Sequence, residues 1–189
     1  LLLISVFASA QETKYNLNFD QTEQGEDLPE DWIVWGEYKI EKDSIHIQSG
    51  EYSAKISSGE NGNTFGSIAY KIPANYKGNS LMLQGFIKTE NISNGFAGLL
   101  LRVDGSSGSL EFDNMQSQGL SGTNDWKEYK IMVRFPEGAK SIYVGGILTG
   151  NGTAWFDNFT LKVNGKKDIQ TLKEKEITYK PADLDSSYA

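Results

Sequence analysis

The stretch "TAWFDNFTL" (153–161) decides the fold that this sequence predicts, because it combines a strand-like alternation with one misplaced charge. Alternate side chains of an extended chain face the same way. Trp155, Phe159 and Leu161 then share one face, which predicts burial, and Asp157 lies in the same register. Burying an unpaired carboxylate is costly. The stretch is therefore an active site, a metal site or the closing strand of a sandwich.

The same period of two recurs from Tyr15 to Val163, with turn residues between the strands, as is typical of β-sandwiches. Aromatic residues make up 12% of the chain, and 20 glycines against 4 prolines indicate many turns. No stretch before residue 165 has sustained helical periodicity. The chain is therefore predicted to be all-β, with two packed antiparallel sheets and an inward-facing set that includes Leu17, Phe19, Ile56, Leu83, Ile87, Leu99, Leu101, Val133, Val144 and Phe159.

The two ends of the chain differ in composition from its middle. The opening "LLLISVFASA" (1–10) is apolar and ends on Ala-Ser-Ala, a pattern that signal peptidase accepts. We interpret residues 1–10 as the end of a secretory signal peptide, which predicts a secreted or periplasmic protein, and without a following Cys no lipoprotein anchor is expected. A buried N-terminal strand is the alternative. Residues 11–165 are then the β-sandwich domain, and the charged residues 166–189 are predicted to be a linker.

Charge and residue content argue against several functions. The net charge of -7 comes without a basic stripe, so no nucleic-acid partner is expected. The absence of cysteine excludes disulfides and thiolate metal sites, and no later apolar stretch reaches the roughly 20 residues of a membrane helix. The one histidine, His46, is expected to point outward from a strand, between the inward-facing Ile45 and Ile47. No nucleophile–base motif accompanies it, so no enzymatic activity is expected of this chain.

The outward face of the middle strands is the candidate binding surface. It mixes amide, Lys, Arg and aromatic side chains, and β-sandwiches bind sugars or peptides through ring stacking and paired hydrogen bonds. The alternatives are an ordinary solvated face, a face covered by a neighbouring domain and, for the tryptophans, a role in sealing the rim. The candidate ligand-binding residues are Trp35, Gln84, Lys88, Arg102, Asp113 and Tyr143.

Several sequence blocks occur in an order that resembles a known superfamily. "NLNFDQ" (16–21), "LPEDWIVWG" (28–36), "SGEYSAKISS" (49–58) and the long block 124–163 together resemble the galactose-binding-like jelly rolls of the carbohydrate-binding-module superfamily, notably the family 4/9-like modules. "GFIKTENISNGFAGLLLRVDG", followed by "LEFDNMQSQGLSGTNDWKEYKI", is similar to the N-terminal accessory domain of secreted Bacteroidetes hydrolases. Those hydrolases are chiefly S41-type peptidases and erythromycin-esterase-like proteins.

The resemblance implies a jelly-roll fold and a non-catalytic accessory role. The module is then expected to bind a glycan or another cell-envelope ligand for a hydrolase whose catalytic domain lies beyond Ala189. The alternative is a structural docking domain that packs on that catalytic domain and binds no soluble ligand. Neither the Ser-Lys pair of the S41 peptidases nor the histidine-rich site of the esterases is present in this sequence.

The resemblance also implies a structural calcium ion. Asp20 and Asp157 match the positions of its acidic ligands, and backbone carbonyls around Gly50 and Glu51 would complete the six to eight oxygens that Ca²⁺ prefers. This sequence departs from the commoner Glu at the first position, and an Asp there has a shorter reach. The alternative is that Asp157 accepts backbone N–H bonds and ties the terminal strands together without a metal. In either case Asp157 is expected to be structural, and the stretch 153–161 to be a closing strand without a catalytic role.

Overall fold

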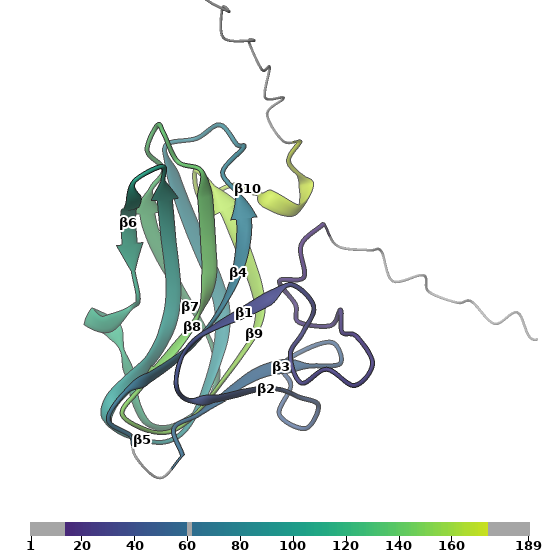
Figure 1. Cartoon of the computed structure of the whole chain (residues 1–189), viewed down its shortest axis with the longest axis vertical. Helices are drawn as coiled ribbons and strands as arrows, with labels where there is room; N and C mark the ends of the chain where they lie inside the picture. Colours follow the sequence, from purple (N-terminus) through teal and green to yellow (C-terminus); the bar gives the residue numbers. More distant parts are fainter. Residues whose placement is uncertain (1–13, 60–61, 174–189) are drawn as a thin grey trace, which may run out of the picture.

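The computed structural model describes residues 14–59 and 62–173 (Figure 1). Within these ranges the chain forms ten strands and two short 3₁₀ helices, and neither helix is long and apolar enough to cross a membrane. The elements are β1 (Trp32–Gly36), β2 (Lys39–Asp43), β3 (Ser53–Ser57), β4 (Phe65–Pro73), β5 (Ser80–Gly105), β6 (Gly108–Asp113), η1 (Gln116–Gln118), β7 (Leu120–Arg134), β8 (Ser141–Thr149), β9 (Asn151–Val163), β10 (Lys167–Asp168) and η2 (Ile169–Thr171).

The strands form two antiparallel layers that share β5. The first part of β5, up to Ser93, pairs with β7 and β9, whereas the part from Ala97 onward pairs with β8 and, from Leu101, with β6. Ala97 itself also pairs with Leu120 at the start of β7. Strand β9 continues one layer to β3 and β2, and β8 continues the other to β4 and β1. We call them the β9 layer and the β8 layer; the β8 layer lies at the front of Figure 1. The predicted antiparallel β-sandwich is thereby confirmed.

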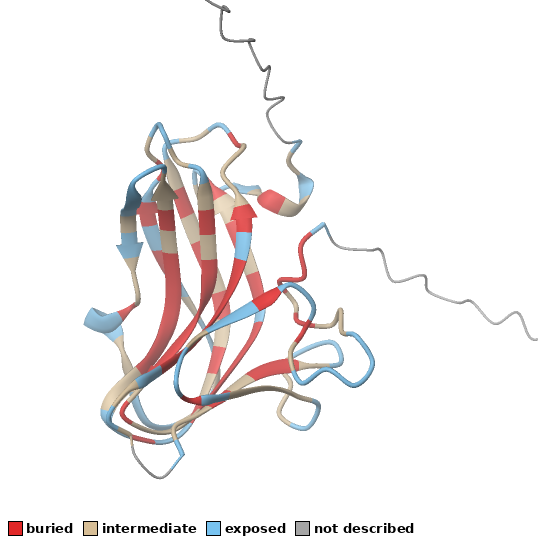
Figure 2. Cartoon of the chain, in the orientation of Figure 1, coloured by how far each residue is buried: buried red, intermediate tan, exposed pale blue. Residues whose placement is uncertain are grey.

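The core lies between the two layers, and buried residues are distributed along the strands of both layers (Figure 2). All ten residues predicted to face inward belong to this core, so that prediction is confirmed. The segment 15–19 alternates as predicted, but it forms turns rather than a strand, and Phe19 has a positive φ of 65°. Its side chains still fill the core. The Phe19 ring stacks on Trp32 at a centroid distance of 4.3 Å and meets Phe159 edge-on at 5.2 Å.

Strand β9 contains a β-bulge that the alternating pattern does not reveal. In the ladder between β9 and β5 the register shifts by one residue, so that Asn158 and Phe159 together oppose Gly85. A bulge of this kind inserts one extra residue into one strand. Asn158 takes the required left-handed conformation, with φ at 51°. Gly85 leaves room for the Phe159 ring, which lies where a Cβ at that position would be.

The bulge reverses which side chains of β9 face the core. Phe156 before it and Phe159 after it both lie in the core, whereas Trp155 does not belong to the core cluster. The prediction that Trp155 and Asp157 share a face with Phe159 and Leu161 is therefore wrong. Trp155 and Asp157 face the other side of the β9 layer, where residues 43–52 cover them. The extra residue at the bulge is the physical reason, because it shifts the period of two by one position.

The folded part extends beyond the predicted boundary at residue 165. Strand β10 pairs with β9, and Ile169 is completely buried in the core. The Gln170 side chain forms two hydrogen bonds to the backbone of Tyr15, one accepted from its N–H at 2.9 Å and one donated to its carbonyl at 2.6 Å. Residues 167–172 are thus part of the module rather than linker. The rest of the predicted linker (174–189) and the predicted signal peptide lie outside the described residues.

We expect Ile169→Ala to lower the free energy of unfolding by about 2–4 kcal/mol, because it empties a fully buried site. Lys166→Ala, at an exposed position of the same segment, is the matched control and should change stability by less than about 0.5 kcal/mol. Urea unfolding of both variants measures the difference. Equal, small effects would show that the segment after Gly165 does not contribute to the core.

Candidate ligand-binding cleft

The exterior of the β8 layer places side chains from four strands in one row. Lys71 on β4 and Arg102 on β5 both stand opposite Tyr143 on β8, and Phe112 on β6 stands opposite Arg102. The neighbours of these residues along β4, β5 and β8 are core residues. Since successive side chains of a strand point to opposite faces, the row lies on the outer face.

Beside this row the face is hollow, because many positions there carry small side chains. The next two rows across β4, β8 and β5 consist of Ala69, Gly145 and Leu100, and of Ser67, Ile147 and Gly98. Trp35, opposite Ser67 on the edge strand β1, leans over these rows, and its ring centroid lies 5.4 Å from that of Tyr143. Ala69 is completely buried even though it lies on the exterior side of its strand. Ser67, Leu100 and Ile147 line the depression that results beside the ring of Trp35.

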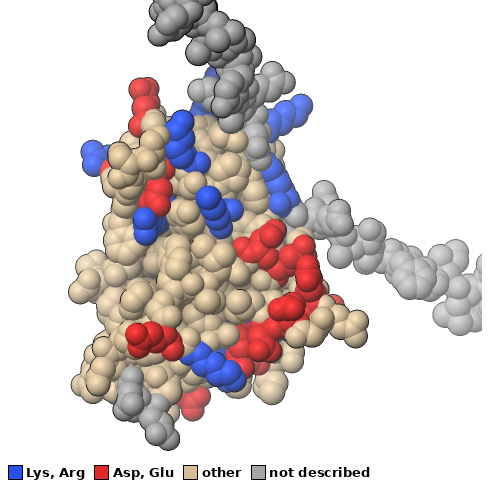
Figure 3. Space-filling view, in the orientation of Figure 1, with Lys and Arg blue, Asp and Glu red and all other residues tan. Residues whose placement is uncertain are grey.

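The resulting cleft has a volume of about 570 Å³, and its lining is mostly apolar: Trp35, Thr64, Phe65, Ser67, Leu100, Arg102, Phe112, Ile147 and Thr149. Leu100 and Ile147 are buried in its floor, with 3% and 8% of their surface exposed, whereas Phe65 and Phe112 are exposed by 39% and 53%. Phe65 and Phe112 line the same mostly apolar cleft, and contiguous exposed apolar patches of this kind mark ligand-binding grooves or interaction surfaces. Figure 3 shows the middle of this face as an uncharged area, with acidic groups along one side.

Arg102 provides the charged group at one end of the cleft. Its Nε donates a hydrogen bond to Asp104 Oδ1 at 2.7 Å, and this bond raises the pKa of Arg102 above its ordinary value. The guanidinium carbon lies 6.0 Å from the ring centroid of Trp35 and 5.9 Å from that of Tyr143. Cation–π contacts of this length are attractive. Asp104 and the two rings thus hold the guanidinium in one orientation.

Three of the six predicted ligand-binding residues meet here, and three do not. Trp35, Arg102 and Tyr143 come together at the cleft. Gln84 and Lys88 lie on β5 before it changes layer, on the outside of the β9 layer, where Gln84 accepts a hydrogen bond from Lys162 at 2.7 Å and Lys88 pairs with Asp125 at 3.0 Å. Asp113 also lies apart from the cleft, and its Oδ1 accepts a hydrogen bond from the backbone N–H of Met115 at the turn before η1.

The sequence did not single out Phe65 and Phe112 as parts of a site. Each is a large apolar residue at the outward position of an otherwise alternating strand, and this is the signal that could have identified them. Their place opposite one another across the cleft depends on the strand order β4-β8-β5-β6, which local alternation does not contain. The floor residue Ile147 could not be placed for the same reason.

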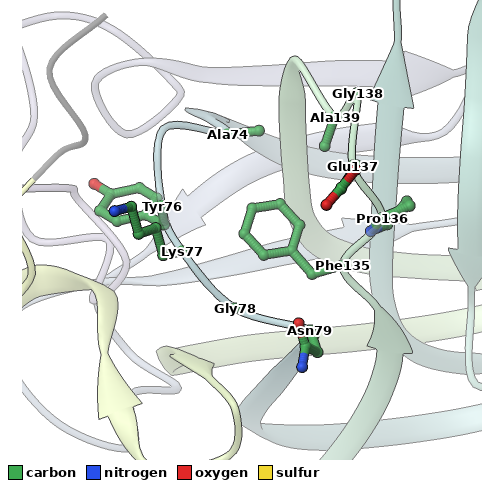
Figure 4. Close-up of a pocket in the computed structure, with 10 residues that line it drawn as sticks. All are labelled: Ala74, Tyr76, Lys77, Gly78, Asn79, Phe135, Pro136, Glu137, Gly138 and Ala139. Carbon is green, nitrogen blue, oxygen red and sulfur yellow. The ribbon is translucent and has the colours of Figure 1, made fainter.

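A second hollow lies between the loops 74–79 and 135–139, at the end of the sandwich where β4 and β7 terminate (Figure 4). The ring of Phe135 lies between the two loops, and Lys77 and Glu137 contribute the charged groups. None of the predicted site residues lines this hollow. Neither charged group has an ion pair among the described residues, so the hollow does not combine an oriented charge with an aromatic wall as the cleft does.

Asp157 is completely buried and accepts backbone hydrogen bonds. Its Oδ2 receives the N–H groups of Gln48 at 2.7 Å and Ser49 at 3.0 Å, and its Oδ1 receives that of Asn158 at 2.6 Å. Burial, aided by the nearby charge of Asp20, raises the pKa of Asp157 to about 6 against the opposing effect of these bonds. The carboxylate thus attaches the 43–52 loop to β9.

Asp20 makes the equivalent connection from the N-terminal segment. Its Oδ1 accepts the N–H groups of Glu51 at 2.7 Å and Tyr52 at 3.1 Å, and its Oδ2 accepts a bond from the Asn18 side chain at 2.7 Å. Gly50 has a positive φ of 71°, and a Cβ there would collide with this carboxylate. Glycine is therefore required at position 50, because only glycine combines that conformation with such a close approach.

The expected calcium ion fits this arrangement poorly. Ca²⁺ needs oxygen ligands, whereas the loop directs four N–H groups at the two carboxylates. One oxygen, Asn18 Oδ1, is buried without a hydrogen-bond partner among the described residues. No group of three or more His, Cys, Asp or Glu side chains suited to a metal occurs in residues 14–59 and 62–173. Because the loop presents N–H groups rather than oxygen atoms to Asp20 and Asp157, it favours anchoring by hydrogen bonds. Calcium binding by these two carboxylates stays a prediction.

His46 lies in the same loop and not on a strand. The prediction that Ile45 points inward is wrong, since 82% of its surface is exposed. His46 Nδ1 lies 3.1 Å from Asp43 Oδ2, which also accepts the Trp155 indole N–H at 2.8 Å. Burial opposes ionisation of Asp43, but the bonds from Ile45, Trp155 and His46 together hold its pKa at about 2. This cluster fixes the loop over Trp155.

No protein-family model matches the chain. Over 135 residues, 67% of the chain, it is 30% identical to the uncharacterized HTH-type transcriptional regulator YbfP of Bacillus subtilis strain 168. The chain spans 45% of the length of that curated relative.

Solved structures share the architecture at low sequence identity. The family 22 carbohydrate-binding module of Clostridium thermocellum Xyn10B has a TM-score of 0.55 at 16% identity, covering 83% of this chain and 96% of that one. The fold is the jelly roll of carbohydrate-binding modules. TmCBM61, solved with β-1,4-galactotriose, has a TM-score of 0.51 at 17% identity, covering 80% and 99% of the two chains. The CBM22-1 xylan-binding domain of Paenibacillus barcinonensis Xyn10C has a TM-score of 0.53 at 12% identity, covering 82% and 97%.

We expect the stability of the protein to increase as the pH falls, because the pKa of Asp157 in the folded state, about 6, lies above its ordinary value of 3.8. The stabilisation is complete below about pH 4 and is lost as the pH rises through about 6. Relative to Asp157→Asn, which does not titrate, the native protein should gain about 2 kcal/mol between about pH 7.5 and 4.5. Urea unfolding at both pH values measures the gain.

The same variant tests the calcium expectation. A bound Ca²⁺ would keep Asp157 ionised and remove the gain at low pH. Anchoring by N–H bonds alone predicts that EDTA and added Ca²⁺ leave the melting temperature unchanged. A rise in melting temperature with Ca²⁺ that is reversed by EDTA and absent in Asp157→Asn would contradict it and establish a metal site.

Proposed function

We propose that this chain is a non-catalytic carbohydrate-binding module that holds a saccharide in the cleft of the β8 layer. The observation that carries the proposal is the cleft itself, an apolar floor between the exposed rings of Phe65 and Phe112, with Trp35 leaning over it. Sugar rings present apolar C–H faces that pack on aromatic side chains, while their hydroxyl groups need a few well-placed polar partners. Arg102 supplies such a partner at one end.

Similarity in fold supports the same ligand class. Among the similar structures, one is described as a xylan-binding domain and another was solved with β-1,4-galactotriose. Both are compact modules of which this chain covers nearly the whole length. Fold similarity at this level of identity does not define a ligand, since unrelated functions share folds. The chemistry of the cleft therefore carries the assignment, and the neighbours support it.

We propose further that the module belongs to a secreted or periplasmic hydrolase, of the S41-type peptidase or erythromycin-esterase-like kind. The resemblance of residues 85–131 to the accessory domains of such enzymes supports this context. In that arrangement the module holds the enzyme at its glycan-containing surroundings.

The alternative function, a docking domain for the catalytic part, is favoured by a different surface. The outside of the β9 layer carries Met132, which is 60% exposed, near the paired side chains of Gln84 and Lys162. Met132 stands opposite Met82 on β5, so the two thioether side chains form a small apolar area that a covering domain would bury. A docking face there would leave the cleft of the β8 layer open, so the two functions are located on opposite sides of the sandwich.

We expect the protein to be retarded in affinity gels that contain its polysaccharide, with xylan and β-1,4-galactan as the first probes. Trp35→Ala and Phe112→Ala should each weaken binding by at least roughly ten-fold, because each removes one stacking surface. Met132→Ala, on the opposite layer, is the matched control and should bind as the native protein does. Binding that is lost in Met132→Ala but kept in Trp35→Ala would place the site on the β9 layer and refute the proposal.

A further inference from the structure

One end of the cleft carries two cations around a single ring. Lys71 Nζ lies 6.0 Å from the ring centroid of Tyr143, and the guanidinium carbon of Arg102 lies 5.9 Å from it. The three residues stand opposite one another on β4, β8 and β5, so the backbone register fixes their order. Trp35, which forms the wall of the cleft, contacts the same ring. The cationic row is thus continuous with the aromatic part of the site.

Most N–H donors of this row have no hydrogen-bond acceptor among the described residues. Arg102 uses Nε for Asp104, and among the described residues its two terminal nitrogens have no hydrogen-bond partner. Lys71 is exposed and forms no ion pair within the same ranges. A guanidinium that is held by Nε presents its remaining N–H groups as a planar fork, which matches the two oxygens of a carboxylate.

The local charge at this end favours an anion despite the acidic protein as a whole. Arg102 and Asp104 neutralise each other, and Lys71 leaves the row with one positive charge. Arg102 is the only ionisable residue that lines the cleft itself. The net charge of -7 acts at longer range, where salt screens it beyond a Debye length of about 8 Å. A ligand carboxylate in contact with Arg102 and Lys71 therefore meets an unneutralised positive charge at close range.

We propose that the cleft selects acidic saccharides, with the carboxylate of a uronic acid residue bound between Arg102 and Lys71. The proposal rests on the carbohydrate-binding function argued above and defines its ligand class. The apolar face of the sugar chain packs over Leu100 and Ile147, between the exposed rings, and its charged group reaches the Tyr143 end. Asp104 is a positioning residue, because it orients Arg102 without contacting the ligand.

The experiment compares matched pairs of polymers in affinity electrophoresis and calorimetry: polygalacturonate with its methyl ester, and glucuronoxylan with its carboxyl-reduced form. The native protein should bind the carboxylated member of at least one pair ten-fold or more tightly. Added NaCl should reduce that preference, because it screens the ionic contacts. Lys71→Gln should reduce the preference several-fold, and Arg102→Gln should abolish it. Lys130→Gln, an exposed lysine on the opposite layer, should retain it.

The outcomes separate this proposal from the function on which it rests. Equal binding of both members of each pair, lost in Trp35→Ala, would keep the carbohydrate-binding function and overturn acidic selectivity. Binding of none of the polymers, charged or neutral, would overturn both. A preference for carboxylated polymers that Lys130→Gln reduces as much as Lys71→Gln would show a general charge effect and also overturn the proposal. Because Lys71 is exposed and leaves no buried partner, its variant remains informative if Arg102→Gln does not fold.

Discussion

Strand β5 is the constraint on which the rest of this structure depends, because it belongs to both layers of the sandwich. Its residues up to Ser93 pair in the β9 layer, and those from Ala97 onward pair in the β8 layer. Asn91 and Asn94 adopt positive φ angles where the strand changes layer. The change of layer determines which outward residues of β5 share a surface. Gln84 and Lys88 therefore point away from the sandwich on one side, and Arg102 on the other.

Because β5 belongs to both layers, the sequence could predict which strand residues are buried but not which surface residues lie side by side. The inward set could be predicted, because every second residue of a strand faces the core whichever layer the strand belongs to. The binding face could not, because alternation does not say which outward residues lie side by side. Arg102, Tyr143 and Trp35 come together only through the order β1-β4-β8-β5, which depends on pairings between residues far apart in the chain.

Local departures from regular structure account for the other places where the prediction and the structure differ. The bulge at Asn158 moves Asp157 from the predicted core face to the side covered by the 43–52 loop. Asp157 is buried as predicted, but on the other side of the layer, and its partners, the N–H groups of Gln48 and Ser49, lie about a hundred residues away in the chain. Likewise Ile169 is one apolar residue in a charged segment, and only its contact with the core shows that the module includes it.

The cleft combines an apolar floor and aromatic walls with one oriented charged group. Leu100 and Ile147 form an apolar floor, and the edge strands β1 and β6 supply the aromatic walls. Arg102 is oriented by Asp104 before any ligand arrives, which limits the entropy that binding must remove. An apolar trough with one fixed polar end suits a ligand that has both an apolar face and a localised polar group.

The most direct test of this account is a ¹H–¹⁵N NMR titration of the native protein with an oligosaccharide of the polymer class that it binds. The account predicts that the Trp35 indole signal and the backbone amides of Leu100, Arg102 and Ile147 shift together and saturate at one ligand concentration. The amides of Gln84 and Lys88, on the opposite layer, should stay in place. Shifts confined to the β9 layer or to the hollow at Phe135, with the Trp35 signal unmoved, would contradict it.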